Sequence, residues 1–273
     1  MEFWKMTGAG NDFIILDNRS LWADSERLSR IAKELCRRRL SIGADGLMAV
    51  EPAQAGGDYK MRFYNADGSI GEMCGNGARC ICRYGYEMGL AGETQKVETT
   101  AGLVTGTRLD KERYQVHLNL PSVLDTQRPT ALGLTGYAEL GNPGVPHGLL
   151  HVPGLKDKTL EELRPMGRAL RYDSAYPKGA NANLYDFLGP NHVLVRTFER
   201  GVEDFTLACG TGTGSLAAYL TVTGQVSKGP VLVENPGGTL QVDVTCEEGK
   251  VTKLLLTGPA TIVCRGTIEE LPL

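Results

Sequence analysis

Two short stretches decide the fold of this chain: Met73-Cys74-Gly75-Asn76-Gly77-Ala78 and Ala208-Cys209-Gly210-Thr211-Gly212-Thr213. They share a Cys-Gly-x-Gly core, and about half of the 273 residues separates their cysteines. Each stretch follows a β-like run with a polar turn, and each begins a run of small residues that favours a helix. We interpret the pair as a duplication, in which two homologous domains each contribute one cysteine to a shared cleft. The alternative is a chance repeat of four positions.

A thiol directly before a helix has distinctive chemistry. The helix N-terminus presents unpaired N–H groups and the positive end of the dipole, which favour a thiolate and can bind a carboxylate. Two such helices around one α-carbon would hold its carboxylate and place a thiol on each face. One thiolate would remove the α-proton while the other thiol delivers a proton to the opposite face. The sequence therefore indicates a cofactor-independent amino-acid epimerase with Cys74 and Cys209 as its acid–base pair.

Other chemistries explain these residues less well. We expect no metal site, because the cysteines lack the paired C-x2-C spacing of zinc ligands. The stretch Gly210–Gly214 lacks the Gly-Lys-Ser/Thr of a P-loop, and no lysine is marked as a pyridoxal-phosphate Schiff base. A cysteine hydrolase would leave the second loop unexplained. The remaining cysteines are interpreted as core residues: Cys36, Cys80, Cys82, Cys246 and Cys264.

Composition excludes several classes of partner. The net charge is −3 and no apolar run reaches membrane-spanning length, so we expect neither a nucleic-acid nor a membrane partner. No signal-peptide pattern begins the chain, and its seven cysteines are an odd number, so reduced thiols in the cytoplasm are expected. The basic run Arg37–Arg39 is interpreted as complementing the dipole of a preceding helix, with an anion-binding patch as the alternative.

Periodicity indicates many short strands and few helices, which is typical of a mixed or antiparallel sheet. Helices are expected over 25–40 with Ser25 as N-cap, over 76–88 with Gly89 as C-cap, and over 213–222. A fourth, over 160–170, is expected to be interrupted by Pro165 and Gly167. The predicted strands are Phe13–Leu16, Leu47–Val50, Lys60–Tyr64, Gly102–Arg108, Gln115–Leu120, Gly148–Val152, Val193–Phe198, Thr239–Val244, Lys253–Leu256 and Thr261–Cys264.

Ordered motifs along nearly the whole chain resemble those of the diaminopimelate epimerase family. The resemblance implies an α+β fold of two pseudo-symmetric domains, each a mixed β-sheet or barrel curled around a central helix. The expected domains are residues 1–120 and 121–262, with a boundary near Pro121–Pro129 and a last strand, about 263–273, that returns to the first domain. The motifs are Gly8–Phe13, Phe63–Ser69, Cys74–Cys80, Pro177–Asn183, Arg196–Gly201, Leu207–Gly212 and Thr257–Ala260.

The same resemblance implies an activity and its residues. The family interconverts LL- and meso-2,6-diaminopimelate in lysine and peptidoglycan biosynthesis, acts on this small diamino dicarboxylate without a cofactor, and suggests a homodimer. Cys74 and Cys209 match its catalytic thiols. The residues that match the contacts to the reacting carboxylate are Gly75, Asn76, Gly210 and Thr211, and those that match the contacts to the distal carboxylate are Asn65, Asn181 and Arg200. Glu199 matches the contact to the distal amine, and Asn11 matches a further substrate contact. His147 and Glu199 match the residues that modulate the cysteine pKa values.

Two positions depart from the family pattern. Val145 stands where a substrate-binding Asn usually precedes the histidine, with Asn142 as a possible substitute, and Gly46 replaces a Gln of some members. These departures leave open a racemase for another amino acid, such as histidine or a lanthionine-like diamino acid. A non-catalytic ligand-binding relative is a third hypothesis, which the presence of both cysteines disfavours. Asn65, Asn181 and Arg200 favour a substrate with a distal carboxylate.

Overall fold

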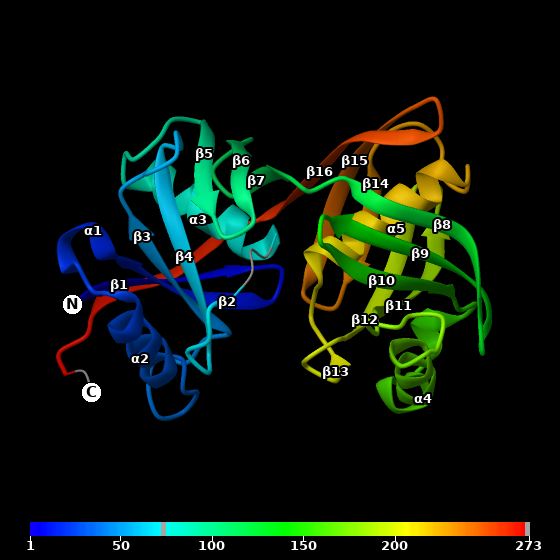
Figure 1. Ribbon diagram of the computed structural model, residues 1–273, viewed down its shortest axis with the longest axis horizontal. Coiled ribbons are helices and arrows are strands. Elements are labelled where there is room, and N and C mark those ends of the chain that lie inside the picture. The colour runs from blue at the N-terminus through cyan, green and yellow to red at the C-terminus, as the bar shows by residue number, and fades with distance from the viewer. Residues whose placement is uncertain (72–74, 271–273) are drawn as a thin grey trace. The chain divides into compact units, whose positions relative to one another are not determined.

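The computed structural model describes residues 1–71 and 75–270 and divides the chain into two compact units. The first unit comprises Met1–Val116 with Gly258–Leu273, and the second comprises His117–Thr257. Each unit contains a mixed β-sheet with few helices (Figure 1). The segment Pro121–Pro129, near which the boundary is expected, belongs to strand β8 (Pro121–Thr130).

The sheet of the first unit begins with β17 (Thr261–Thr267), which pairs antiparallel with β1 (Glu2–Gly8). The order continues through β2 (Asn11–Asp17, antiparallel), β3 (Gly46–Glu51, parallel), β4 (Tyr59–Asn65, antiparallel), β5 (Thr94–Thr99, parallel), β6 (Gly102–Arg108, antiparallel) and β7 (Arg113–His117, antiparallel).

The second unit repeats this order. Strand β8 pairs antiparallel with β9 (Gly133–Gly141). The sheet continues through β10 (Gly144–His151, antiparallel), β11 (Asn181–Gly189, parallel), β12 (His192–Glu199, antiparallel), β14 (Val231–Asn235, parallel), β15 (Gly238–Glu247, antiparallel) and β16 (Lys250–Pro259, antiparallel).

Both units therefore follow one series of strand orientations, which confirms the duplication. The helices occupy equivalent places as well. Helix α2 (Ser25–Leu35) connects β2 to β3, as α4 (Leu160–Arg171) connects β10 to β11. Helix α3 (Gly75–Glu87) lies between β4 and β5, and α5 (Gly210–Val222) lies between β12 and β14. The short elements are α1 (Asn18–Leu21), η1 (Leu155–Asp157) and β13 (Asp204–Phe205).

Each sheet curls around the helix that begins directly after the cysteine of its Cys-Gly-x-Gly stretch. All residues from Gly75 to Gly85 of α3 are buried, and so are nearly all residues from Gly210 to Leu220 of α5. Helix α3 approaches the strands closely at Gly77, where an added Cβ would lie 2.5 Å from Met48 Cε, so that a larger residue would displace the Met48 side chain. The expected fold, a mixed sheet around a central helix in each domain, is confirmed.

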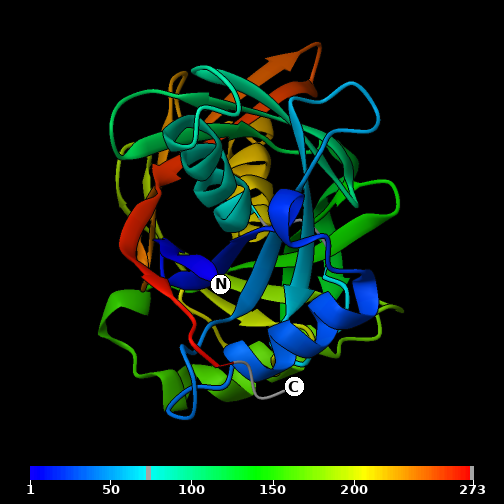
Figure 2. The same ribbon diagram turned by 90° about the vertical axis from the view of Figure 1, so that its left-hand side faces the viewer.

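The outer face of each sheet is covered by the other helix. In the first unit, α2 and α3 lie on opposite sides of the strands (Figure 2). The i, i+3, i+4, i+7 spacing of Leu28, Ile31, Ala32 and Leu35 gives α2 one apolar face. That face packs with Ile14, Leu16, Leu47, Ala49 and Tyr64. Helix α4 covers the second sheet similarly, through Leu163 and Leu170.

Local details correct several predictions. Asp24, not Ser25, caps α2, with its side chain accepting from the Arg27 N–H, and the helix ends at Leu35, not residue 40. Helix α4 is unbroken despite Pro165, and a Thr159–Glu162 capping box starts it. Gly89 follows α3 with φ +66°, as expected for a C-terminal cap. Residues 118–120 lie outside strand β7.

Among the described residues, no helix is both long and apolar enough to span a bilayer.

Candidate active site

Cys209 is the N-cap of the central helix of the second unit. Its backbone is extended (φ −117°, ψ 109°), and its Sγ accepts a hydrogen bond from the Gly212 N–H at 3.4 Å. Only 7% of the residue is exposed. This is the predicted position at a helix N-terminus, where the dipole and N–H groups favour a thiolate. Cys74 lies outside the described residues, and α3 begins at the next residue, Gly75.

A chain of side chains leads from Cys209 into the core. Thr211 Oγ1 lies 3.5 Å from Cys209 Sγ and 3.1 Å from His147 Nε2. His147 is fully buried on β10. Burial, with a smaller contribution from the charge of Arg200, lowers the pKa of His147 to about 3. The imidazole is therefore neutral at physiological pH and carries one proton.

Three of the residues matched to the distal end of the substrate, Asn181, Glu199 and Arg200, lie where β11 begins and β12 ends. Asn181 starts β11, and Glu199 ends β12. Asn181 Oδ1 accepts from the Arg200 N–H at 2.7 Å, and Arg200 Nη1 donates to the Lys178 carbonyl at 3.2 Å. Parallel pairing puts His147 opposite Asn181. In the second unit, a hydrogen bond thus connects Asn181 with Arg200. Separately, the side chain of Thr211 contacts both His147 and Cys209.

The first unit holds a matching set around the start of α3. Asn76 is fully buried, and its Nδ2 donates to Asn11 Oδ1 at 2.6 Å. Its Oδ1 accepts from Arg79 Nη2 at 2.8 Å, while Arg79 Nη1 donates to the Gly75 carbonyl at 3.2 Å. Asn11 and Asn76, both matched to substrate contacts, are therefore directly bonded to each other.

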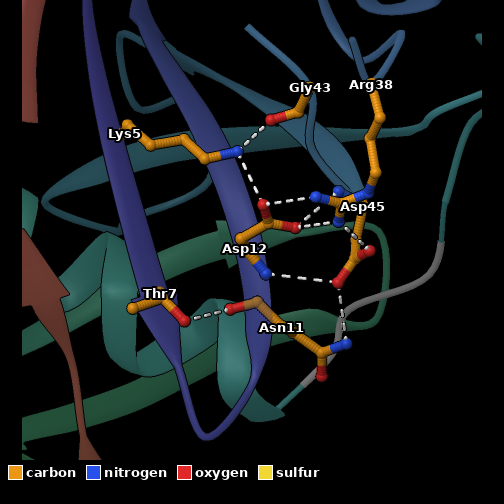
Figure 3. A network of polar contacts seen from close by, with 7 residues as sticks. All are labelled: Lys5, Thr7, Asn11, Asp12, Arg38, Gly43 and Asp45. Atoms are coloured by element: carbon orange, nitrogen blue, oxygen red, sulfur yellow. Dashed lines mark hydrogen bonds and ion pairs between the residues drawn. The ribbon is translucent and has the colours of Figure 1, made fainter. Parts of the chain in front are cut away.

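An ion-pair network fixes Asn11 from its other side (Figure 3). Asn11 Nδ2 donates to Asp45 Oδ2 at 3.0 Å, and Arg38 pairs with both Asp45 and Asp12, at 2.9 and 2.5 Å. Lys5 adds an ion pair to Asp12 at 2.7 Å and donates to the Gly43 carbonyl. Burial opposes ionisation of Asp12, but hydrogen bonds from Arg38 and Lys5 hold its pKa below the ordinary value.

This network gives one residue of the basic run a specific partner set. Arg38 lies just beyond the end of α2 at Leu35, and its guanidinium joins the β1–β2 hairpin to the loop before β3. Asp12 and Asp45 stand next to residues that the motifs single out, Asn11 and Gly46. That adjacency is the sequence signal that could have found them.

The packing around Gly46 leaves no room for a side chain. A Cβ there would lie 2.3 Å from the Phe63 ring and 2.6 Å from the Tyr64 carbonyl oxygen. A glutamine at this position would require both the Phe63 ring and the Tyr64 backbone to move. Gly46 pairs in register with Asn65, which is exposed at the end of β4 and donates from Nδ2 to Ser69 Oγ at 2.9 Å.

At the other departure, Val145 precedes His147 by two positions on β10. Both side chains therefore lie on one face of the sheet, and Val145 is half-buried. Asn142 is exposed in the turn between β9 and β10. Val145, an apolar residue, thus takes the place next to His147 where the family pattern has an amide.

Two buried polar residues were missed in the sequence, namely Asn183, which contacts His147, and Thr197, which contacts Asn183. Asn183 is fully buried, and its Oδ1 accepts from Thr197 Oγ1 at 3.0 Å. Asn183 Nδ2 lies 3.3 Å from His147 Nδ1. The signal was the alternation in Asn181-Ala182-Asn183, because residues two apart in a strand share a face.

The other cysteines divide into two groups. Cys36, Cys80 and Cys82 are buried as predicted, and burial raises the pKa values of Cys36 and Cys82 to about 12. The core interpretation is wrong for Cys264, which is exposed, and for Cys246, which is half-buried. Within 1–71 and 75–270, no cluster of three or more His, Cys, Asp or Glu residues could hold a metal ion.

Solved structures with this fold include racemases. The chain matches a probable proline racemase from Agrobacterium radiobacter K84 with a TM-score of 0.70 and 16% identity, covering 99% of this chain and 93% of that one. It matches a phenazine biosynthesis protein of the PhzF family from Bacillus anthracis with a TM-score of 0.72 and 17% identity, covering 97% and 98%. At such low identity, the likeness shows the fold alone. This chain therefore belongs to the structural class, two repeated units each with a mixed sheet around a helix, whose fold these proteins share.

Sequence comparison identifies the family within that class. The family model of diaminopimelate epimerase matches residues 3–121 and 140–263. The chain is 36% identical to a diaminopimelate epimerase of Aquifex aeolicus, covering 99% of this chain and 98% of that protein. It is 37% identical to one of Methanothrix thermoacetophila, covering 99% and 96%. The chain belongs to the diaminopimelate epimerase family.

Proposed function

We propose that this protein is a diaminopimelate epimerase, an isomerase that interconverts LL- and meso-2,6-diaminopimelate through Cys74 and Cys209 without a cofactor. The observation that carries the proposal is a cysteine at the N-cap of a buried central helix, in a chain similar over nearly its full length to named diaminopimelate epimerases. One thiolate removes the α-proton, and the other thiol protonates the opposite face. In the reverse direction the two thiols exchange roles.

The negative charge formed at the α-carbon needs stabilisation at the adjacent carboxylate. Gly75 and Asn76 begin α3, and Gly210 and Thr211 begin α5, so their N–H groups belong to the unpaired first turns of the two helices. Such groups bind carboxylates and stabilise the charge that develops on them. We assign the reacting carboxylate to these four residues.

We assign the distal carboxylate to Asn65, Asn181 and Arg200, the distal ammonium to Glu199, and a further contact to Asn11. A guanidinium fork with amide donors suits a carboxylate, and an anionic glutamate suits an ammonium. The hydrogen bond between the Arg200 N–H and Asn181 Oδ1 supports a common site for these two residues. His147 and Glu199 are assigned to tuning the two thiols.

Domain limits, assembly and location are part of the same proposal. The two epimerase domains are residues 1–120 with about 263–273, and residues 121–262. We propose a homodimer in the cytoplasm, where the six described cysteines, all free, would remain reduced. Light scattering of the purified protein should give twice the mass of the chain, and a mass of one chain would contradict the dimer.

A substrate panel in D2O tests the activity. LL-diaminopimelate, L-histidine and a lanthionine isomer are incubated with the protein, and mass spectrometry measures deuterium at the α-carbon. We expect incorporation with diaminopimelate and at least about 100-fold less with the others. Incorporation confined to histidine or lanthionine would indicate the racemase alternative, and none with any substrate would indicate a non-catalytic relative. Cys74→Ala and Cys209→Ala should each lower the rate by about 10²–10⁴-fold or more.

The distal carboxylate is tested separately with Arg200. Arg200→Ala should raise KM for diaminopimelate far more than it changes exchange of a monocarboxylate amino acid, because only the former has a second carboxylate. Arg200→Lys, which keeps the charge without the fork, is the matched control and should lie between. Equal losses on both substrates would show that Arg200 is structural.

A further inference from the structure

Asn183 is held in one orientation by its surroundings. Its Nδ2 lies 3.1 Å from the Gly148 carbonyl and 3.2 Å from the Asn181 carbonyl, and its Oδ1 accepts from Thr197 Oγ1 at 3.0 Å. A flipped amide would place Oδ1 against two carbonyl oxygens, which cannot donate. The amide nitrogen therefore faces these carbonyls and, at 3.3 Å, also faces His147 Nδ1.

This orientation determines the tautomer of His147. The two amide protons of Asn183 are shared among three acceptors, the two carbonyls and the ring nitrogen. Because an amide nitrogen does not accept, a proton on His147 Nδ1 would face no acceptor there, so Nδ1 carries the lone pair. On a neutral imidazole the single proton is then on Nε2. Nε2 lies 3.1 Å from Thr211 Oγ1, and in this tautomer it is the donor to that oxygen.

The hydroxyl of Thr211, whose oxygen accepts from His147, can then donate its single proton to another acceptor. Cys209 Sγ lies 3.5 Å from this oxygen. The sulfur also accepts from the Gly212 N–H at 3.4 Å. Two donors to one sulfur favour the ionised form, because hydrogen bonds to a charged acceptor are stronger than those to a neutral one.

We propose that Asn183 is a positioning residue that holds His147 as the Nε2–H tautomer, so that the Thr211 hydroxyl donates to Cys209 and stabilises its thiolate. The proposal depends on the proposed function in one respect only, namely that Cys209 is one of the two reacting thiols. Asn183 and Thr197 contact no thiol in this chain of hydrogen bonds; they act through His147 and Thr211.

Close packing supports a fixed chain. Asn183 and His147 are fully buried, so no bulk water competes for the imidazole nitrogens. A Cβ added at Gly212 would lie 2.4 Å from Asn183 Oδ1, 3.3 Å from Cys209 Sγ and 3.3 Å from His147 Nδ1. The first turn of α5 thus touches three of the groups involved and leaves them little freedom to rearrange.

The tautomer can be measured without substrate. The protein has four histidines, and long-range ¹H–¹⁵N NMR of ¹⁵N-histidine-labelled protein distinguishes Nδ1–H from Nε2–H rings. The His147 signal is assigned by its loss in His147→Gln. We expect the Nε2–H tautomer in the wild type and a proton on Nδ1 in Asn183→Asp, whose carboxylate accepts. An Nδ1–H ring in the wild type would overturn the proposal.

The effect on the thiol is measured by alkylation. Iodoacetamide modifies thiolates, and peptide mass spectrometry gives the rate at Cys209 as a function of pH in the free enzyme. Thr211→Val should slow it about tenfold at pH 7, because it removes a donor to the thiolate, while the control Thr211→Ser stays within about twofold. Asn183→Asp should slow it similarly, and the double variant should be no slower than Thr211→Val alone.

Several outcomes contradict the proposal. Additive effects of Asn183→Asp and Thr211→Val would show that Asn183 does not act through Thr211. Equal rates in Thr211→Val and Thr211→Ser would show that the hydroxyl does not serve Cys209; this comparison remains decisive if Asn183→Asp fails to fold. If the protein does not epimerise diaminopimelate, the proposed function fails, while tautomer and alkylation still test the hydrogen-bond chain.

Discussion

The buried residue His147, which contacts Cys209 through Thr211, makes the stability of the folded chain depend on pH. His147 has no carboxylate among its hydrogen-bond partners, which are the Thr211 hydroxyl and the Asn183 amide. Because burial lowers its pKa to about 3, the folded chain keeps this ring neutral under conditions in which the unfolded chain protonates it. Below the unfolded pKa of about 6.5, protonation therefore favours unfolding.

The stability of the wild type should thus fall more steeply with acid than that of His147→Gln. Between about pH 6 and pH 4, the unfolding free energies should converge by roughly 1.4 kcal/mol per pH unit, since one extra proton binds the unfolded wild type. Urea unfolding at several pH values measures this difference, with the exposed His151→Gln as control. Parallel curves for wild type and His147→Gln would mean that His147 is not buried in its neutral form.

Gly212 offers a second test at the same scale. Gly212→Ala should destabilise the protein by about 1–3 kcal/mol and lower activity, because its Cβ collides with Asn183. At Gly92, no atom lies within 4 Å of an added Cβ, so Gly92→Ala serves as the matched control and should be nearly neutral. Equal denaturation midpoints for the two variants would refute the tight packing around Cys209.

At the scale of elements, the sequence predicted the helix α2 but not the residue that caps its N-terminus. Ser25 and Asp24 are both good N-caps, and neither the sequence pattern nor propensity chooses between neighbours. In the structure Asp24 caps α2, and the Ser25 hydroxyl lies 3.0 Å from the Tyr64 hydroxyl. The choice depends on a contact with a distant strand, which local sequence does not reveal.

Substitution of the N-cap residue Asp24 should therefore lower the free energy of unfolding more than substitution of its neighbour Ser25. We expect Asp24→Ala to lower the unfolding free energy by about 1 kcal/mol, through loss of the hydrogen bond to the Arg27 N–H. Ser25→Ala should cost less, because its hydroxyl contact is only partly buried. Chemical denaturation of both variants measures the difference, and a larger loss in Ser25→Ala would contradict the assignment of the cap.

Strands were predictable where apolar and polar residues alternate along the sequence, because one face of the strand is then buried and the other exposed. The prediction of Gly102–Arg108 matches β6 in full. Strand β11 was missed because both of its faces are buried over Asn181–Tyr185, including two asparagines that look like turn residues. Strand β8 was missed because most of it is partly or fully exposed and shows no alternation. The cysteine at the start of α5 was predictable, whereas Asn183, Thr197 and the Arg38 network depend on long-range contacts.

At the scale of the whole molecule, the repeated series of strand orientations explains why two Cys-Gly-x-Gly stretches occur half a chain apart. Each unit places its central helix after the fifth strand of the series, and the glycines allow each helix to lie close to its sheet. A duplicated scaffold supplies two similar helix N-termini, and two opposed acid–base groups are what inversion at one carbon requires. We therefore expect Cys74 and Cys209 to be equivalent in kind and opposite in role.

Deuterium distribution at early times tests this two-thiol mechanism most directly. LL-diaminopimelate is incubated with the enzyme in D2O, and the remaining substrate and the meso product are analysed separately before equilibrium. Two thiols predict one deuteron in the product and almost none in the remaining substrate, because the abstracted proton stays on one thiol while the other delivers a deuteron from solvent. Deuterium appearing at equal rates in both pools would contradict the assignment of Cys74 and Cys209 to opposite faces.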